Sequence, residues 1–316
     1  MTEEGSAPNR PETIRAVPVR HPGRWVAVAV IAVLAAMFVH MLLTNDRFQW
    51  RFMFDNMFRG PVLRGAETTV ILTVLSMAIG VALGIVVAVM RLSGNPILRW
   101  SAWTYTWFFR AIPRYVLLFV CGNLGYLYPQ LHFLGLPFSD QIADLLNIDV
   151  SGTIWNLNGN DFFRGFKAAL LGLALSEAAY MAEIVRAGIL AVDTGQLEAA
   201  QSLGMSRALG MRRVVLPQAM RVIVPPTGNE TIAMLKDTSL VSAVPVTNEL
   251  FFQLEAIGHR TFVVFPMLVA AVLWYLALSS VLMVGQYYIE RHFSRGFGAR
   301  RDGGAPVPAI AAGLDH

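Results

Sequence analysis

The sequence predicts an all-α membrane protein with several spanning helices, and three observations lead to this fold class. The 316 residues are 55% hydrophobic and only 15% charged, whereas soluble domains carry about 25% charged residues. The mean hydropathy is +0.52. The apolar residues gather in runs of roughly 20, the length that a helix needs to cross a bilayer. Short polar segments rich in arginine separate these runs, as in a polytopic protein.

The N-terminal elements are a tail, a first span and an interfacial segment. Residues 1–24 contain four prolines and scattered charges, which predicts a disordered tail. The apolar run at 25–43 is too long for the core of a typical signal peptide, and no small-residue cleavage site follows it. We therefore expect a retained first span. Residues 44–64 mix aromatic and arginine side chains, a composition that suits a helix lying in the membrane interface.

Two further spans are expected before the middle of the chain. The second covers about 66–90 and contains Gly80 and Gly84, whose four-residue spacing allows another helix to approach closely. The third covers about 103–125 and contains Pro113. Its aromatic N-terminal edge is typical of the boundary between membrane and water.

The C-terminal half predicts three more spans. Residues 126–163 are acidic and contain several glycines and asparagines, so they are too polar to span and form an external segment. The remaining apolar runs are at 165–190, 227–250 and 263–289. The segment from 293 to 316 is rich in glycine, arginine, alanine and proline, which predicts a second disordered tail.

The arginine distribution predicts the orientation, because basic residues favour the cytoplasmic side. With the N-terminus inside, fourteen arginines fall in cytoplasmic segments (10, 15, 20, 24, 91, 99, 207, 212, 213, 221, 291, 295, 300, 301) and six in external ones (47, 51, 59, 64, 164, 260). The four arginines of 44–64 oppose this trend. An even number of spans returns the C-terminus to the inside, so we expect both termini and both tails in the cytoplasm.

The composition excludes several other classes of protein. The net charge of +4 and the pI near 9.5 do not indicate a nucleic-acid partner, because no basic run is interleaved with exposed aromatics. The single cysteine, Cys121, lies in an apolar run and predicts a packed thiol. His40, His132 and His259 have no partners at metal-ligand spacing. We expect no catalytic residue, no metal site and no cofactor in this chain.

A polar loop at 191–217 interrupts the apolar pattern. Residues 197–203 can form two helical turns, with Glu198 near their start, where the helix dipole favours a carboxylate. Ala199 and Ala200 are small enough to let this helix sit in a groove on another protein. The alternative interpretation is an ordinary amphipathic connector.

The second half of this loop predicts a bend. Gly204 suits the left-handed residue that ends a helix. Ser206 can cap a second short helix running to Val215, and Pro217 is expected to end it. The loop should therefore be a helix–turn–helix that lies across the membrane face.

The spacing of this loop resembles the coupling loop of the permease subunits of bacterial ABC importers. The matching residues are Glu198, Ala199, Ala200, Gly204, Val214, Leu216 and Pro217. The flanking sequences are similar to permeases for polar amino acids, upstream in 178–188 and downstream in Leu216-Pro217-Gln218-Ala219-Met220-Arg221 and Lys236-Asp237-Thr238-Ser239-Leu240. One departure is Ala111-Ile112-Pro113-Arg114, where the family often has Gly-Thr-Pro-Leu.

The resemblance implies a fold and an activity. The fold is that of a type I ABC importer permease, with a five-helix core over 65–292 and an accessory first helix. The chain would be a transport subunit of the bacterial cytoplasmic (inner) membrane that moves a polar amino acid. Its coupling residues would be Glu198, Ala199, Ala200, Gly204, Leu216 and Pro217. The sequence does not identify which amino acid is carried.

The resemblance also implies partners. The chain has no Gly-x4-Gly-Lys-Ser/Thr phosphate loop, so ATP and magnesium would bind to a separate ATPase dimer. A second permease chain, identical or homologous, would complete the pore. An external solute-binding protein would deliver the amino acid.

Charged residues inside the expected spans are the candidates for the substrate path. An unpaired charge at the membrane centre costs at least roughly 2.5–3.5 kcal/mol, so these groups should face protein or a water-filled path. They either contact the substrate or form an ion-pair network between helices, and Thr238 and Ser239 can also bond back to the helix backbone. The candidates are Glu183, Arg186, Lys236, Asp237, Thr238 and Ser239.

A second function remains open at this point. An ion- or proton-coupled secondary carrier could use the same four charged residues as its coupling network. Such carriers tend to contain inverted repeats, and no convincing internal repeat is present in this sequence.

Overall fold

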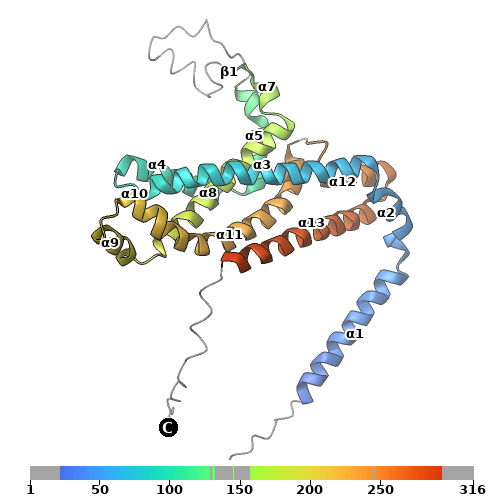
Figure 1. The fold of residues 1–316 in the computed structure, drawn as a ribbon. Helices are drawn as coiled ribbons and strands as arrows, with labels where there is room; N and C mark the ends of the chain where they lie inside the picture. Colours follow the sequence, from blue (N-terminus) through green and yellow to red (C-terminus); the bar gives the residue numbers. More distant parts are fainter. Residues whose placement is uncertain (1–21, 129, 132–144, 146–156, 245, 294–316) are drawn as a thin grey trace, which may run out of the picture. The chain divides into compact units, whose positions relative to one another are not determined.

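The computed structural model describes residues 22–128, 130–131, 145, 157–244 and 246–293 (Figure 1). The chain divides into two compact units, Met1–Gln49 and Trp50–His316, and each is described by itself. The predicted tails at 1–24 and 293–316 lie almost wholly outside the described residues, as does most of the predicted external segment at 126–163.

The first unit consists of helix α1 (Pro22–Thr44) and the short 3-10 helix η1 (Asp46–Phe48). The segment Gly23–Thr44 is long and apolar enough to cross a membrane, and no residue of its most apolar 18-residue stretch is buried by protein. A helix that is apolar on every face and exposed along its length suits a lipid environment. The first span expected from the sequence therefore forms as one helix.

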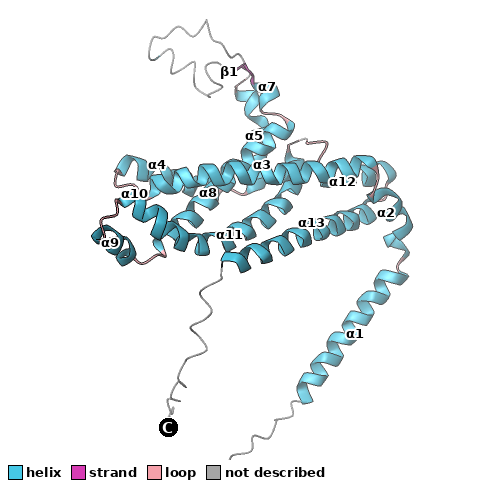
Figure 2. Cartoon of the chain, viewed as in Figure 1, coloured by secondary structure: helices cyan, strands magenta, loops and turns pink. Residues whose placement is uncertain are grey.

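The second unit is almost entirely helical in its described residues (Figure 2). Its long helices are α3 (Gly60–Arg91), α4 (Pro96–Ala111), α5 (Arg114–Leu127), α8 (Gly165–Leu190), α11 (Leu216–Asp237), α12 (Leu250–Thr261) and α13 (Val264–Phe293). The shorter ones are α2 (Trp50–Met57), α7 (Gly159–Phe162), α9 (Thr194–Ser202), α10 (Arg207–Gly210), the π-helical η2 (Met211–Val215) and the 3-10 helix η3 (Thr238–Ala243). Two two-residue strands, β1 (Gln130–Leu131) and β2 (Leu157–Asn158), pair antiparallel.

Helix α8 is the centre of the second unit, where it packs against α3, α4, α5 and α11. Two-thirds (67%) of its apolar window is buried, compared with 33% for α3 and 22% for α13. Small residues allow this central position, because they let backbones approach closely. A Cβ atom at Gly80 of α3 would lie 2.7 Å from Glu177 Cβ, and one at Gly84 would lie 2.6 Å from Met181 Cβ. The close approach predicted for the Gly80–Gly84 pair is confirmed.

A second apolar cluster joins α2, the start of α3, α12 and α13. Met53, Val62, Leu250 and Leu254 are completely buried in it. The Trp274 ring nitrogen of α13 donates a hydrogen bond to the Met57 carbonyl at the end of α2, at 2.9 Å. The segment 44–64, expected to be one interfacial helix, is therefore three pieces: η1, α2 and the first turn of α3.

The third expected span, 103–125, is two helices rather than one. Helix α4 ends at Ala111, Ile112 and Pro113 are extended, and α5 begins at Arg114. The break has a local cause, because proline disfavours the helical conformation of the residue before it. Pro113 lacks an N–H and stands immediately before the first residue of α5, where none is needed.

The fifth expected span, 227–250, is displaced toward the N-terminus. Helix α11 begins at Leu216 and ends at Asp237, and η3 continues to Ala243. The next helix, α12, begins at Leu250, and the pattern of apolar runs does not predict it. By length and composition, four helices of the described residues can cross a membrane, in 23–44, 60–91, 165–190 and 264–293. Helix α5 is shorter, and α11 contains Pro225 and Pro226.

Candidate functional site

The polar loop forms a bent pair of helices, α9 and α10. Helix α9 ends in a left-handed residue, Gly204, with φ of +83°. The Gly204 N–H donates to the Gln201 carbonyl at 2.9 Å, and the Met205 N–H donates to the Ala200 carbonyl at 3.1 Å. This pair of bonds is the Schellman arrangement that ends a helix. Ser206 then accepts from the Leu209 N–H and caps α10, so both predicted caps are confirmed.

We call the bent pair of helices, residues Thr194–Gly210, the bracket. One side of the bracket is packed and the other is exposed. Ala200 is 4% exposed and lies beside Gly210, where an added Cβ would meet the Ala200 Cβ at 3.5 Å. Glu198 and Ala199 are exposed. Leu203 is 81% exposed, so the tip of the bracket carries a large apolar side chain in the open.

The position expected for Glu198 at the start of its helix is wrong. Helix α9 begins at Thr194, because the Asp193 carboxylate caps it by accepting a hydrogen bond from the Gly195 N–H at 2.7 Å. Glu198 therefore lies one turn inside the helix, beyond the region where the helix dipole acts strongly.

The helix end expected at Pro217 is also wrong. The helical chain runs from α10 through η2 into α11, and Pro217 lies in the first turn of α11. Proline normally breaks a helix because its ring clashes with the carbonyl four residues earlier. Here the Leu216 N–H bonds to the Met211 carbonyl, five residues back, and such a wide turn gives the ring room. The bracket is thus continuous with α11, while Leu216 and Pro217 remain exposed.

Among the candidate membrane charges, Glu183 lies in a small ion-pair network. Arg186 donates to Glu183 Oε2 from Nε at 3.0 Å and from Nη2 at 2.8 Å. Arg91, at the end of α3, donates to Glu183 Oε1 at 3.2 Å. The shared face predicted for Glu183 and Arg186 is confirmed, and Arg91 joins α3 to α8 at this carboxylate.

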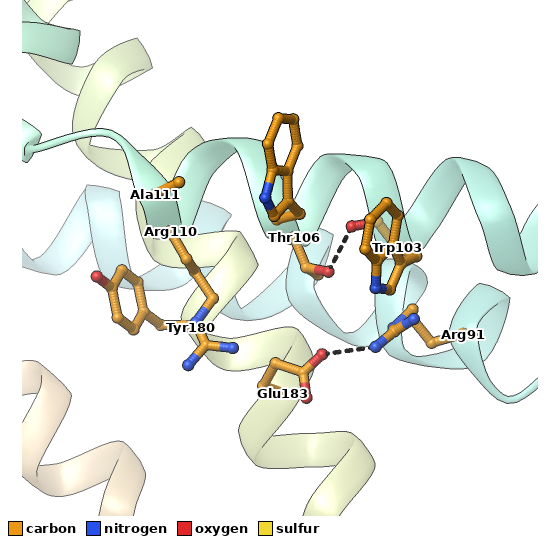
Figure 3. A pocket seen from close by; sticks show the side chains of 8 residues that line it. Arg91, Trp103, Thr106, Arg110, Ala111, Tyr180 and Glu183 are labelled. Carbon is orange, nitrogen blue, oxygen red and sulfur yellow. Dashed lines mark hydrogen bonds and ion pairs between the residues drawn. The ribbon is translucent and has the colours of Figure 1, made fainter.

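This network borders a cavity of about 440 Å³ between α4 and α8 (Figure 3). Arg110 and Tyr180 point toward each other in it, with the Arg110 guanidinium 5.5 Å from the centre of the Tyr180 ring. Such a distance allows a cation–π interaction. The lining residues are Arg91, Trp103, Thr106, Trp107, Arg110, Ala111, Tyr180 and Glu183.

A second and more buried charge cluster surrounds Arg114, the first residue of α5. Its Nη2 lies 3.0 Å from Glu177 Oε2 and 3.6 Å from Glu230 Oε2, and its Nη1 lies 2.5 Å from Asp237 Oδ2. The side chain of Glu177 is 0% exposed, whereas those of Glu230 and Asp237 are 25% and 29% exposed. We call these four residues the Arg114 cluster; they join α5, α8 and α11.

Tyr180 lies between the cavity and the Arg114 cluster. The Arg114 guanidinium is 4.8 Å from the centre of the Tyr180 ring, and the Arg110 guanidinium is 5.5 Å from the same centre. One aromatic ring thus contacts the guanidinium on each side of the Ile112–Pro113 break, and the two polar regions adjoin.

The remaining candidates lie apart from these clusters. Lys236 is exposed and lines a different cavity, of about 530 Å³, together with residues of α12 and α13. Thr238 donates to the Leu235 carbonyl and Ser239 to the Lys236 carbonyl, each at 2.7 Å. Both hydroxyls therefore bond back to the backbone, which was one of the two interpretations.

Of the Arg114 cluster, only Asp237 is among the candidates predicted from the sequence. Glu177, Glu230 and Arg114 are not among them. A usable signal was present, since Glu177 and Glu230 are carboxylates inside apolar runs, where charged residues are rare and usually functional.

Comparisons with known proteins assign the family. Residues 80–295 match the family described as binding-protein-dependent transport system inner membrane component. The chain belongs to this family of inner membrane transport components. The Arginine transport system permease protein ArgU of Corynebacterium glutamicum is 47% identical over 292 residues, covering 92% of this chain and 87% of the relative. The Probable glutamine ABC transporter permease protein GlnM of Bacillus subtilis is 30% identical, covering 78% and 98%.

Solved structures of transporters agree with this membership. A crystal structure of an amino acid ABC transporter with histidines matches with a TM-score of 0.55 and 31% identity, over 73% of this chain and 94% of that chain. An inward-facing structure of the MetNI methionine ABC transporter, at 20% identity and a TM-score of 0.54, supports the fold alone. The inner membrane component therefore has the type I ABC importer permease fold and is a transport subunit rather than an enzyme. The secondary-carrier alternative gains no support from these relatives.

Proposed function

We propose that this chain is the translocation subunit of an ATP-driven importer for a polar amino acid, and that its bracket transmits the action of a separate ATPase. The observation that carries this proposal is the bracket's open side. Glu198, Ala199 and the 81% exposed Leu203 face away from the packed helices. A small residue beside an exposed carboxylate lets this helix enter a groove on a partner, where Glu198 can accept charge-assisted hydrogen bonds.

The continuity of the bracket with α11 supports a coupling role. Displacement of α9 and α10 acts on a helix that runs without interruption through η2 to Asp237. That helix carries Glu230 and Asp237 of the Arg114 cluster. Closure of an ATPase dimer against the bracket would therefore shift two of the four groups in the cluster, as in a rigid-body switch. Glu198, Ala199, Gly204, Leu216 and Pro217 form the proposed coupling surface, and the buried Ala200 supports it from beneath by packing against Gly210.

The partners and the cargo follow from the same proposal. ATP and magnesium bind to the ATPase subunits, a second permease chain completes the pore, and an external solute-binding protein delivers the cargo. Both termini and the bracket face the cytoplasm of a bacterial inner membrane. The 47% identity to a protein named for arginine transport favours a basic amino acid as the cargo.

Two substitutions on the bracket test the coupling role. We expect Glu198→Arg, which reverses the exposed charge, and Gly204→Asp, which puts a side chain on the left-handed residue, to abolish ATP-driven uptake of L-arginine into proteoliposomes. Open space surrounds Gly204, so membrane insertion and the amount of purified chain should not change. The strain of a non-glycine residue there is roughly 1 kcal/mol, too little to unfold the protein.

A matched control lies on another loop of the same predicted side. Gly94 also has open space around a Cβ and lies in the turn between α3 and α4. We expect Gly94→Asp to retain uptake and copurification with the ATPase. Full ATP-driven uptake by both bracket variants would refute the coupling role. Uptake by the purified chain on a proton gradient without ATP would favour the secondary carrier.

A further inference from the structure

The Arg114 cluster holds more negative than positive charge. Three carboxylates, Glu177, Glu230 and Asp237, lie within 4.0 Å of one guanidinium, so the formal charges sum to minus two. Buried charges are costly unless they are paired. The cluster therefore favours the approach of a further cation.

No second cation of the described residues supplies that charge. Lys236 is next to Asp237 in the sequence, but neighbouring helical residues point about 100° apart. Lys236 instead lines the cavity beside α12 and α13 and forms no ion pair within the described residues. Arg110 lies on the other side of Tyr180. The described ion pairs of Glu177, Glu230 and Asp237 thus go to Arg114 alone.

An unpartnered acceptor lies inside the cluster. Glu177 is fully buried, and no donor of the described residues reaches its Oε1. A buried carboxylate oxygen without a donor is unfavourable by roughly 1–3 kcal/mol. Its other oxygen is held by Arg114. The cluster can therefore accept a further hydrogen bond besides those from Arg114. Glu230 and Asp237 are partly exposed, so a ligand can enter from their side.

We propose that the three carboxylates bind the cationic side chain of the transported amino acid, and that Arg114 is a tethered occupant of the same site that must move aside to admit it. This inference rests on the proposed transport function. A guanidinium already seated among these carboxylates shows that the site fits this chemical group, since planar guanidinium matches carboxylate geometry. The substrate class is thus a basic amino acid, with arginine as the direct counterpart of Arg114.

The position of Arg114 gives it a way to leave. It is the first residue of α5, directly after the extended Ile112–Pro113 break, and no side chain caps that helix start. A change in the angle between α4 and α5 would move Arg114 relative to α8 and α11. The Tyr180 ring, 4.8 Å away, offers the displaced guanidinium a second favourable contact. Displacement of Arg114 is then coupled to the helix movements of transport.

Binding of radiolabelled L-arginine to the full chain, purified with its ATPase and reconstituted in nanodiscs, tests this inference without the solute-binding protein. The decisive variant is the double substitution Arg114→Leu with Glu177→Gln. It removes one positive and one negative group and keeps the formal charge of the cluster at minus two. Its reference is Glu177→Gln alone, which keeps the same two carboxylates. Removing an internal competitor that occupies the site about nine-tenths of the time should make the apparent Kd of the double variant about tenfold lower than that of Glu177→Gln.

Further variants separate an occupant from a structural counterion. Arg114→Lys keeps a tethered cation and should leave the Kd close to that of the wild type. Glu230→Gln removes a carboxylate that the ligand can reach and should weaken L-arginine binding about tenfold, the loss of about one charge-assisted hydrogen bond. Glu255→Gln, on α12 and in an exposed pair with His259, is the matched carboxylate control and should change nothing. Binding of the neutral probe L-glutamine should not improve in any variant.

Each result has a defined meaning. An affinity of the double variant equal to or weaker than that of Glu177→Gln, or an equal gain for L-glutamine, overturns the tethered-occupant role. If the double variant does not assemble with the ATPase, the Glu230→Gln result decides whether the carboxylates form the site. If the wild-type complex shows no ATP-driven uptake of any polar amino acid, the proposed function is refuted. That result does not depend on the binding affinities of the variants.

Discussion

At the scale of single residues, Glu249 explains how the loop before α12 is held. It is fully buried, and the donors that reach it are uncharged. The Thr69 and Tyr275 hydroxyls donate to its Oε1 at 2.7 and 2.6 Å. The Phe251 and Phe252 N–H groups donate to its Oε2 at 2.7 and 3.2 Å. One carboxylate thus caps α12 and ties it to α3 and α13.

We expect Glu249→Ala to lower the stability of the purified chain by roughly 2 kcal/mol or more. The substitution removes a helix cap and leaves buried donors without an acceptor. Glu249→Gln keeps an amide oxygen for the cap and should have a smaller effect. A thermal-unfolding series in detergent measures both variants. If the alanine and glutamine variants were equally stable, the cap and the two hydroxyl hydrogen bonds would make no net contribution to stability.

At the scale of elements, the contact between α3 and α8 depends on the absence of side chains. Gly80 and Gly84 on α3 face Glu177 and Met181 on α8. This contact also positions the Arg114 cluster, because Glu177 belongs to that cluster and its side chain packs against Gly80 of α3. The packing of two apolar helices and the placement of a buried charge thus share one surface.

We expect Gly84→Ala to destabilise the chain by about 1–3 kcal/mol, because the new methyl group must displace Met181 or the α8 backbone. Gly285→Ala, on α13, is the matched control, since a Cβ there meets nothing within 4 Å. The midpoint of thermal unfolding should fall for the first variant and remain unchanged for the second. Equal unfolding midpoints for the two variants would show that α3 and α8 can move apart without lowering the stability of the chain.

At the scale of the whole molecule, the orientation in the membrane decides which partner each surface meets. The arginine distribution predicts that the bracket is cytoplasmic and that the turn between α12 and α13 is external. Leu203 and Phe262 are 81% and 93% exposed at these two positions. Cys121 is free and 3% exposed, so the packed thiol expected from the sequence is confirmed and leaves little background for cysteine labelling.

We expect a membrane-impermeant maleimide to label Phe262→Cys, made in a Cys121→Ser background, on intact spheroplasts. Leu203→Cys in the same background should react only in inside-out vesicles. Gel-shift of the labelled chain measures both reactions. Labelling in the opposite pattern would reverse the orientation and remove the bracket from the reach of an ATPase.

Features with local causes could be predicted from the sequence. The left-handed residue at Gly204 and the Glu183–Arg186 pair involve groups within one or two helical turns, so spacing and residue type suffice. The helix continuing past Pro217 could not be predicted in this way. A proline usually ends such a helix, and only the wide turn of η2, which depends on backbone geometry, accommodates its ring.

Apolar run length, helix caps and motif spacing are properties of contiguous residues, so the chain's pattern is enough to predict the membrane class, the polar bracket and the family. The contacts of Arg114 with Asp237, 123 residues away, and with Glu177 and Glu230 arise from the folding of the chain. That meeting depends on the α4–α5 break and on the close packing of α8. Pairing between distant charges follows from how helices pack, and no periodicity in the chain encodes it.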